Sequence, residues 1–413
     1  MLTISNLLIN RRLLIMLFLG FSSGLPLALT SSTLQAWFTE SHISLVTIGS
    51  LSLLGIPYVL KFLWAPLMDY YRFLWFGKRR GWILLTQISL VIMLILLSNM
   101  NPATQAAKMA IFALTIAFFS ASQDIAIDAY RADVLAPQER GLGAAYFIFA
   151  YRIAMLASGG LALVCADYLG WKITYELMAM LLLLSMIPAY WSPNVTEYPT
   201  SARNILHSIF KSLQALLQRE KIIWILLFVI FYKLGAALEI ALMTNFLLHG
   251  LGFSLTEVGF AYKTVGFVAA MVGGFFGGLL LTRFSLYQAL LWFGLAQAFS
   301  NFMFIGLAIT GKHFLFMTFS MFIENFCTGL TAAAFLAFLM SLCDHRFTAG
   351  QFALLSAIDS LGRVFLGPIA ALIVESQGWV QLYIWSFVLC FPGLIFLLML
   401  KEKVPYHVHA AVD

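Results

Sequence analysis

Residues 13–38 read LLIMLFLGFSSGLPLALTSSTLQAWF and contain no charged side chain. An α-helix of this length, at 1.5 Å per residue, is long enough to cross the roughly 30 Å hydrocarbon core of a bilayer. Arg11 and Arg12 precede the run, as in an export signal, but no small-residue cleavage site interrupts it. The stretch therefore predicts a first membrane-spanning helix.

The rest of the chain has the same character. Of its 413 residues 62% are hydrophobic and 10% are charged, whereas a soluble domain carries about 25% charged residues. The apolar runs are continuous and lack the alternation at every second position that outer-membrane strands require. We therefore expect an all-α polytopic membrane protein with about twelve transmembrane helices. The predicted spans are residues 13–38, 44–68, 83–99, 108–134, 142–166, 172–191, 222–248, 256–281, 286–310, 314–342, 351–374 and 379–400.

The distribution of basic residues predicts the orientation. With the N-terminus inside, most of the 24 Lys and Arg residues fall on the cytoplasmic side of these spans, as the positive-inside rule requires. Both termini are then cytoplasmic. The net charge of +6 is explained by this topology and by contact with lipid headgroups, so no nucleic-acid partner is expected.

The chain divides near its midpoint. Segment 192–221 carries prolines and an amphipathic run, and short sequences before it recur after it: residues 44–49, SLVTIG, resemble residues 254–259, SLTEVG. Such an echo at about half the chain length is typical of duplicated transporter halves. We predict an N-terminal six-helix bundle over 1–191, a cytoplasmic connecting loop over 192–221, and a C-terminal six-helix bundle with a short tail over 222–413.

The loop after the second span carries an acid and then a basic cluster: Asp69, followed by Lys78, Arg79 and Arg80. It resembles the loop signature of the major facilitator superfamily, and the resemblance implies that fold and a latch between helix ends made by Asp69, Arg79 and Arg80. The alternative is ordinary cytoplasmic basic charge.

Two carboxylates lie in the fourth span. Asp124 and Asp128 are four residues apart and point to one helix face. Two carboxylates so placed in a low dielectric resist being ionised together, so one of them is expected to hold a proton. Both residues are therefore candidates for proton coupling, because a symporter needs a proton that can be bound and released. The alternative is a structural ion pair with a nearby Arg.

Basic residues lie within spans of both halves: Lys61, Arg152, Lys233, Lys263 and Arg363. Charged groups at membrane depth are costly and mark functional sites or internal pairs. Gathered at one cavity, they would suit an anionic solute through charge-assisted contacts. The alternative is pairing with internal acids, namely Asp124, Asp128, Glu239, Glu324 and Asp359. Aromatic neighbours, Tyr58 and Tyr151 among them, are candidates for stacking on sugar rings.

The sequence lacks the parts of a membrane enzyme or metal site. All seven His residues fall in loops, at helix ends or in the tail, so no Ser has a His base at membrane depth. The four Cys residues show no metal-type spacing. We expect neither an enzyme nor a cofactor, and a proton gradient as the energy source.

Several of these segments together resemble the AmpG muropeptide permease family. They are residues 20–38, the run KFLWAPLMD at 61–69, SASQDIAIDAY at 120–130, YKLG at 232–235, QFALLSA at 351–357 and GRV at 362–364. The resemblance implies proton-driven import of anhydro-muropeptides across the inner membrane of a Gram-negative bacterium, for peptidoglycan recycling and β-lactamase induction. It assigns Gln123 to substrate binding and Asp124 and Asp128 to the family's acidic motif. The other predicted substrate contacts are Tyr58, Lys61, Tyr151, Arg152, Lys233, Glu239, Lys263 and Arg363.

The chain departs from the family pattern at two places. Ala236 stands where an Asp follows the YKLG run, and the nearest acid is Glu239, one turn on. The two additional C-terminal spans of some relatives are also lacking. Two alternatives therefore stay open: import of another large anionic solute, such as a siderophore or acetyl-CoA, and a muropeptide sensor that does not transport. A monomer is expected.

Overall fold

The computed structural model describes residues 11–65, 68, 77–135, 140–193, 221–281, 283–342 and 348–401. The chain forms two compact units. Unit 1 comprises residues 1–43 and 54–205, and unit 2 comprises residues 44–53 and 206–413. Residues 44–53 thus pack with the later half of the chain, a grouping that no local sequence pattern indicates.

Within the described residues, twelve helices are long and apolar enough to cross a membrane. The prediction of about twelve spans is confirmed. The sequence predicts continuous apolar runs, but several of these spans are interrupted. Among them are the first, Arg11–Glu40, the second, Leu45–Leu63, the fifth, Tyr146–Leu169, the seventh, Ile222–Gly250, and the eighth, Leu255–Leu280. Gly55 and Pro57 fall at a junction in the second span, and a charged residue, Lys233, stands at a break in the seventh.

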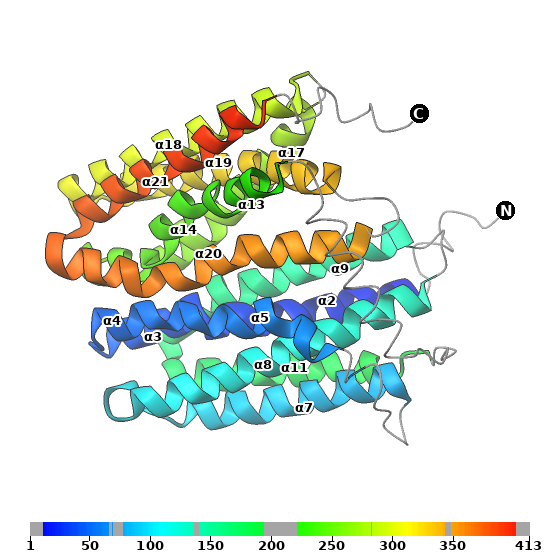
Figure 1. Cartoon of the computed structure of the whole chain (residues 1–413). Coiled ribbons are helices and arrows are strands. Elements are labelled where there is room, and N and C mark those ends of the chain that lie inside the picture. The colour runs from blue at the N-terminus through cyan, green and yellow to red at the C-terminus, as the bar shows by residue number, and fades with distance from the viewer. Residues whose placement is uncertain are drawn as a thin grey trace, which may run out of the picture. The chain divides into compact units, whose positions relative to one another are not determined.

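Unit 1 is built from long helices and shorter segments that continue them (Figure 1). They are α2 (Arg11–Thr30), α3 (Ser32–Glu40), α5 (Ile56–Leu60), η2 (Lys61–Leu63), α7 (Lys78–Ser98), α8 (Pro102–Val134), α9 (Arg140–Leu156), η3 (Ala157–Leu161), α10 (Ala162–Leu169) and α11 (Trp171–Tyr190). Helix α7 packs against α8 and α11, and α2 packs against α8, α9 and α11. Helix α2 therefore lies at the centre of the contacts in this unit.

The contact between α2 and α9 is a close approach of backbones. A Cβ at Gly20 would overlap the Phe147 carbonyl, and one at Gly24 would overlap the Tyr151 carbonyl. These two glycines are one turn apart and face the same helix, so the pair allows α2 to approach α9 over a full turn. The close packing holds the α2 face that carries Ser22 and Ser23 in a fixed position.

Unit 2 contains the remaining elements. They are α4 (Leu45–Ser50), η1 (Leu51–Gly55, at the boundary of the units), α13 (Ile222–Phe231), α14 (Leu234–Ile240), α15 (Met243–Asn245), η4 (Phe246–Gly250), α16 (Leu255–Val258), η5 (Gly259–Val265), α17 (Gly266–Leu280), α18 (Leu286–Thr310), α19 (Phe314–Ser341), α20 (Thr348–Gln377) and α21 (Trp379–Met399). Helix α18 packs between α19 and α21. The segments η4 and η5 are π-helical, a form that is often found at functional sites.

The early segment α4 packs on α20 within unit 2. A Cβ at Gly49 would overlap the Gly367 carbonyl, and Ser52 Oγ donates a hydrogen bond of 2.6 Å to the Val364 carbonyl. Small residues on both sides let the two backbones touch. This contact is what joins residues 44–53 to the second half of the chain.

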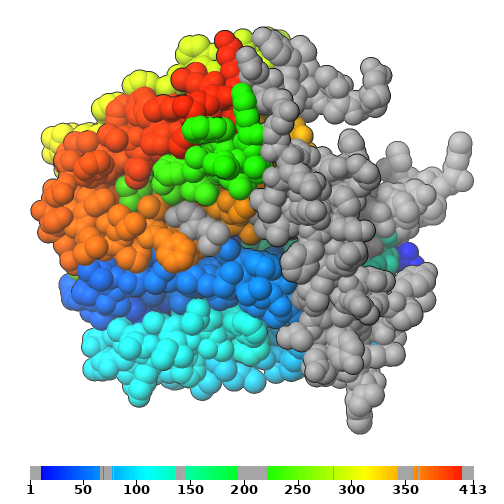
Figure 2. Space-filling view, viewed as in Figure 1, coloured from blue at the N-terminus to red at the C-terminus, as the bar shows by residue number. Residues whose placement is uncertain are grey.

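Each unit keeps an apolar core and an apolar outer surface. Large side chains such as Ile111 on α8 and Phe275 on α17 are 64% and 72% exposed. Helices α7 and α8 (cyan) and α21 (orange to red) contribute to the outer surface of their own units (Figure 2). Exposed apolar side chains of this size on long helices are those of a protein whose surroundings are hydrocarbon.

A valine at Gly24 tests whether the α2–α9 approach holds unit 1 together. We expect Gly24→Val to lower the stability of the purified protein by about 1–3 kcal/mol, the usual cost of overpacking, measured by thermal unfolding in detergent. Gly278→Val on α17 is the matched control, because no atom lies within 4 Å of a Cβ at Gly278. Equal unfolding temperatures for the two variants would contradict the role of this contact.

Candidate functional site

Two polar contacts join α2 to α8 inside unit 1. Gln123 Nε2 donates a hydrogen bond of 2.9 Å to Ser22 Oγ, and Ser23 Oγ donates one to the Asp124 carboxylate. Ser22, Ser23 and Gln123 are almost fully buried. Consecutive residues of one helix therefore hold consecutive residues of the other, and Asp124 is fixed in place by a single short side chain.

Several predicted site residues surround Asp124. Lys61 on η2, Tyr58 on α5 and Tyr151 on α9 lie close enough to interact with its carboxylate electrostatically. The structure thus brings together, within unit 1, a carboxylate, a cation and two phenols that the sequence had singled out separately. Such a set can bind and release a proton and can hydrogen-bond a polar solute.

Asp128 has different surroundings from Asp124. Its side chain is 50% exposed, and its Oδ1 lies 3.1 Å from Arg131 Nη2. Arg131 also lies over the ring of Phe147, 4.6 Å from the ring centroid. Asp128 is still near enough to interact electrostatically with Asp124. The ion pair with a nearby Arg, which was the alternative for Asp128, is therefore present.

Of the three predicted latch residues, the structure describes two. Arg79 Nε lies 3.0 Å from Asp133 Oδ2, and Arg80 donates a hydrogen bond to the Tyr190 carbonyl. Asp69 lies outside the described residues. The described contacts tie α7 to α8 and to the end of α11.

In unit 2, two predicted substrate contacts share one acid. Lys233 Nζ lies 4.0 Å from Asp359 Oδ2, and Arg363 Nη2 lies 3.0 Å from the same oxygen. Lys233 also sits over the ring of Phe335, 4.5 Å from its centroid. The internal pairing considered as the alternative is present for these two cations.

Two other cations have no ion pair within 4.0 Å among the described residues. Lys263 Nζ lies 3.8 Å from the centroid of the Tyr262 ring, and both residues belong to the π-helical segment η5. Arg152 on α9 is exposed, although it follows a residue that contacts the Gly24 position. Among the described residues, neither the Lys263 nor the Arg152 side chain is neutralised by an ion pair with an acid.

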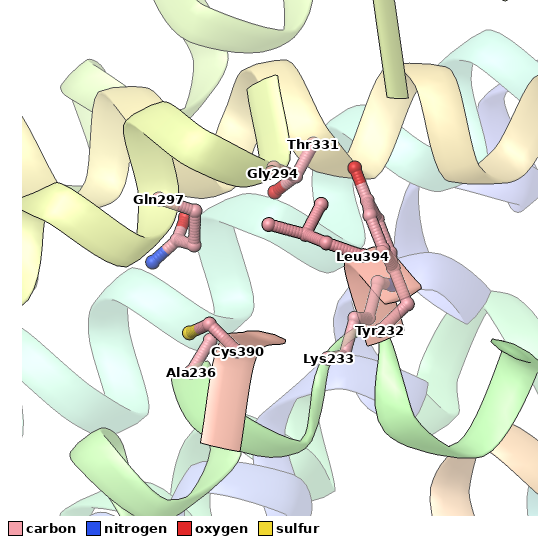
Figure 3. A pocket seen from close by; sticks show the side chains of 8 residues that line it. All are labelled: Tyr232, Lys233, Ala236, Gly294, Gln297, Thr331, Cys390 and Leu394. Carbon is pink, nitrogen blue, oxygen red and sulfur yellow. The ribbon is translucent and has the colours of Figure 1, made fainter. Parts of the chain in front are cut away.

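A small pocket lies within unit 2 (Figure 3). It has about 10 Å³ of space for a water, which is near the minimum that one water molecule needs. Its lining comes from α14, α18, α19 and α21 and from the break between α13 and α14. It consists of Tyr232, Lys233, Ala236, Gly294, Gln297, Thr331, Cys390 and Leu394. Of these, Lys233 is the one residue that is also among the substrate contacts predicted from the sequence.

Glu239 lies in a second polar cluster of unit 2. Its side chain is fully buried, and neither of its oxygens receives a hydrogen bond from the protein. It faces Glu324 on α19, which accepts hydrogen bonds from three side chains: Gln297 at 2.5 Å, Thr328 at 3.0 Å, and Ser300. The polar residues of α18 were missed from the sequence, although Gln297, Ser300 and Asn301 stand out in an otherwise apolar span.

Comparison with known proteins gives the family and the fold. Residues 16–349 match the family described as Major Facilitator Superfamily. The anhydromuropeptide permease of Escherichia coli (strain K12) is 47% identical over 393 residues, which cover 95% of this chain and 80% of that protein. A putative transporter AmpG 1 of Rickettsia conorii is 30% identical and is covered over 99% of its length.

Solved structures share the architecture at low sequence identity. A D-xylose-proton symporter superposes with a TM-score of 0.72 at 14% identity, over 97% of this chain and 98% of that one. A POT family transporter in complex with 5-aminolevulinic acid gives 0.73 at 13% identity, over 95% and 96%. The predicted fold class and the resemblance to AmpG proteins are confirmed, and these relatives are transporters, not enzymes.

The shared acid of unit 2 makes a prediction for stability. Asp359→Asn leaves Lys233 and Arg363 facing each other without a counter-charge, so it should be more destabilising than Lys233→Met. Because residues of one ion-pair network couple by about 0.5–3 kcal/mol, the double variant should be more stable than the sum of the two single losses predicts. Thermal unfolding of the parental protein, the two single variants and the double variant measures these losses of stability. Losses that add in the double variant would contradict an energetic coupling between Lys233 and Asp359.

Proposed function

Since this chain belongs to the Major Facilitator Superfamily, we propose that it is a proton-driven secondary transporter that imports anhydro-muropeptides from the periplasm to the cytoplasm. One observation carries the substrate class: the chain is 47% identical, over 95% of its length, to a protein named anhydromuropeptide permease. The substrates are GlcNAc-anhydro-MurNAc disaccharides with or without a stem peptide. The protein resides in the bacterial inner membrane as a multi-pass monomer with both termini in the cytoplasm. The muropeptides that it imports are used for peptidoglycan recycling and act as the signal for β-lactamase induction.

Asp124 is the proposed proton-coupling residue. It lies at membrane depth, is held by the Ser23 hydroxyl, and has Lys61 as its nearby cation and Asp128 as its nearby anion. An ionisable group in such a place is expected to be functional. The exposure of Asp128 and its ion pair with Arg131 favour a supporting role, in which Asp128 sets the charge that Asp124 experiences.

The acidic stem peptide needs cations on the protein. Removing a carboxylate from water without a compensating partner costs several kcal/mol. Lys61, Arg152 and Lys263 are the best-placed candidates, because they are not paired within 4.0 Å with an acid among the residues that the structure describes. Lys233 and Arg363 are proposed contacts only where the solute displaces Asp359 from them. Gln123, Tyr58, Tyr151 and Glu239 complete the proposed set.

Transport of radiolabelled anhydro-muropeptide into right-side-out vesicles with an imposed proton gradient tests the whole proposal. Accumulation that a protonophore abolishes is the expected result. Accumulation that is insensitive to the protonophore would contradict proton coupling. Binding without accumulation would favour a sensor, and accumulation of a siderophore or acetyl-CoA in place of the muropeptide would favour another anionic solute.

Asp124→Asn tests the proton site in the same vesicles. We expect uptake to fall to the level of empty vesicles while the protein stays folded, because Asn keeps the shape and the Ser23 contact but cannot exchange a proton. Glu176→Gln is the control, since Glu176 is an exposed acid of unit 1 that pairs with Lys172 at 3.9 Å. Protonophore-sensitive accumulation near the parental level in Asp124→Asn would remove Asp124 from the mechanism.

Lys61→Met tests how the peptide carboxylates are held. The variant should weaken binding of the peptide-bearing muropeptide more than that of the peptide-free disaccharide, because only the former carries the additional carboxylates. Direct binding to purified protein measures both ligands, and Lys233→Met provides a comparison in which Asp359 already neutralises the cation. If Lys61→Met weakens binding of the two ligands equally, Lys61 interacts with Asp124 and not with the peptide carboxylates.

A further inference from the structure

A pair of carboxyl groups is buried in unit 2 with no counter-charge among the residues that the structure describes. Glu239 at the end of α14 is fully buried and Glu324 on α19 is 3% exposed, and the two carboxyls lie within hydrogen-bonding range of each other. In the described part of the chain no Lys, Arg or His forms an ion pair with either of them. Two ionised carboxylates in this position would repel each other where no water screens the charge.

The hydrogen-bond donors around the pair are distributed unequally. Gln297 Nε2 and Thr328 Oγ1 donate to Glu324 Oε1, and Ser300 Oγ donates to Glu324 Oε2. Three donors satisfy one carboxylate well. Glu239 receives none, and both of its oxygens are buried. The surroundings therefore stabilise a charge on Glu324 and give no support to a charge on Glu239.

We propose that Glu239 and Glu324 form a proton-binding site in which Glu239 holds the proton and donates a hydrogen bond to the Glu324 carboxylate. The proton supplies the donor that the contact between two carboxyls otherwise lacks. It also reduces the buried charge of the pair to a single negative charge, which Gln297, Ser300 and Thr328 hold. The proposed site gives unit 2 a proton of its own, in addition to Asp124 in unit 1.

The other titratable groups that face the pair leave this charge unchanged. They are the phenols of Tyr262 on η5 and Tyr383 on α21, and the thiols of Cys327 on α19 and Cys390 on α21. Phenols and thiols are neutral in their ordinary state near pH 7. Lys263 packs on the ring of Tyr262, and Lys233 is occupied by Asp359.

A small pocket adjoins the polar cluster that holds the pair. Gln297 both donates to Glu324 and lines the pocket of Figure 3. Ala236, which lines the same pocket, is three residues before Glu239 on α14 and so lies on the same helix face. The pocket has room for about one water molecule, and a water there would lie beside Gln297, the donor to Glu324.

Infrared spectroscopy of the purified, full-length protein in lipid nanodiscs tests the site without any solute. At neutral pH the protein should show the carbonyl stretch of a protonated carboxylic acid, and labelling with carbon-13 glutamate should shift part of this band. The label separates a glutamic acid from Asp124. Glu239→Gln should remove the glutamate part of the band, because the Gln amide can donate to Glu324 in place of the proton.

Two further variants keep the test decisive. Glu324→Gln changes the partner of Glu239 and should move or remove the same band. Glu257→Gln should leave the band unchanged, because Glu257 is a partly exposed acid in the first turn of α16 that lies 3.5 Å from Lys312 Nζ. Absence of the glutamate band, or a band that neither Glu239→Gln nor Glu324→Gln alters, would overturn the proposal. Stabilisation by sodium that Glu239→Gln abolishes, with no acid band, would assign the site to a metal cation instead. None of these outcomes depends on which solute is transported.

Discussion

The polar side chains of this protein must find their partners within it, because hydrocarbon provides neither donors nor acceptors. Ser22 and Ser23 meet Gln123 and Asp124 across α2 and α8, and Asp359 meets Lys233 and Arg363. These contacts require helices that approach closely. Gly20 and Gly24 of α2 allow the close approach to α9. Ser22 and Ser23 of the same helix face α8. Packing and the proposed proton site therefore depend on the same few residues of the first span.

The spans could be predicted from the sequence because they follow from a local rule, and the same kind of rule makes Asp124 a candidate for function. A run of about twenty apolar residues spans a bilayer, and a carboxylate within such a run needs a reason to be there. The sequence makes Asp124 and Asp128 alike as candidates, but the structure gives the two carboxylates different surroundings. Residues four apart share a helix face but differ by about 6 Å along the axis, and over that distance the surroundings change from the Ser23 hydroxyl to an exposed ion pair with Arg131.

Other features of the site depend on contacts that no local pattern contains. Glu324 is recognisable as an acid in an apolar span, but the three donors that hold it come from two helices. The break in the helix at Lys233 also could not be predicted from hydropathy. The length of an apolar run indicates a span, but it does not show where the hydrogen bonds inside the helix are interrupted. The pairing of the two cations with Asp359 was among the alternatives that the sequence left open, because one side chain can serve a solute or an acid with the same chemistry.

The boundary between the two units falls inside η1. This position constrains how the sequence of such a chain can evolve. Ser52 and Val364 are 312 positions apart yet hydrogen-bonded, and Gly49 touches Gly367. Selection on residues 44–53 therefore acts together with selection on α20, although the two segments belong to different halves of the gene. A hybrid protein that joins the first half of one relative to the second half of another at the central connection would inherit these two surfaces from different parents, so their fit would limit which natural recombinants survive.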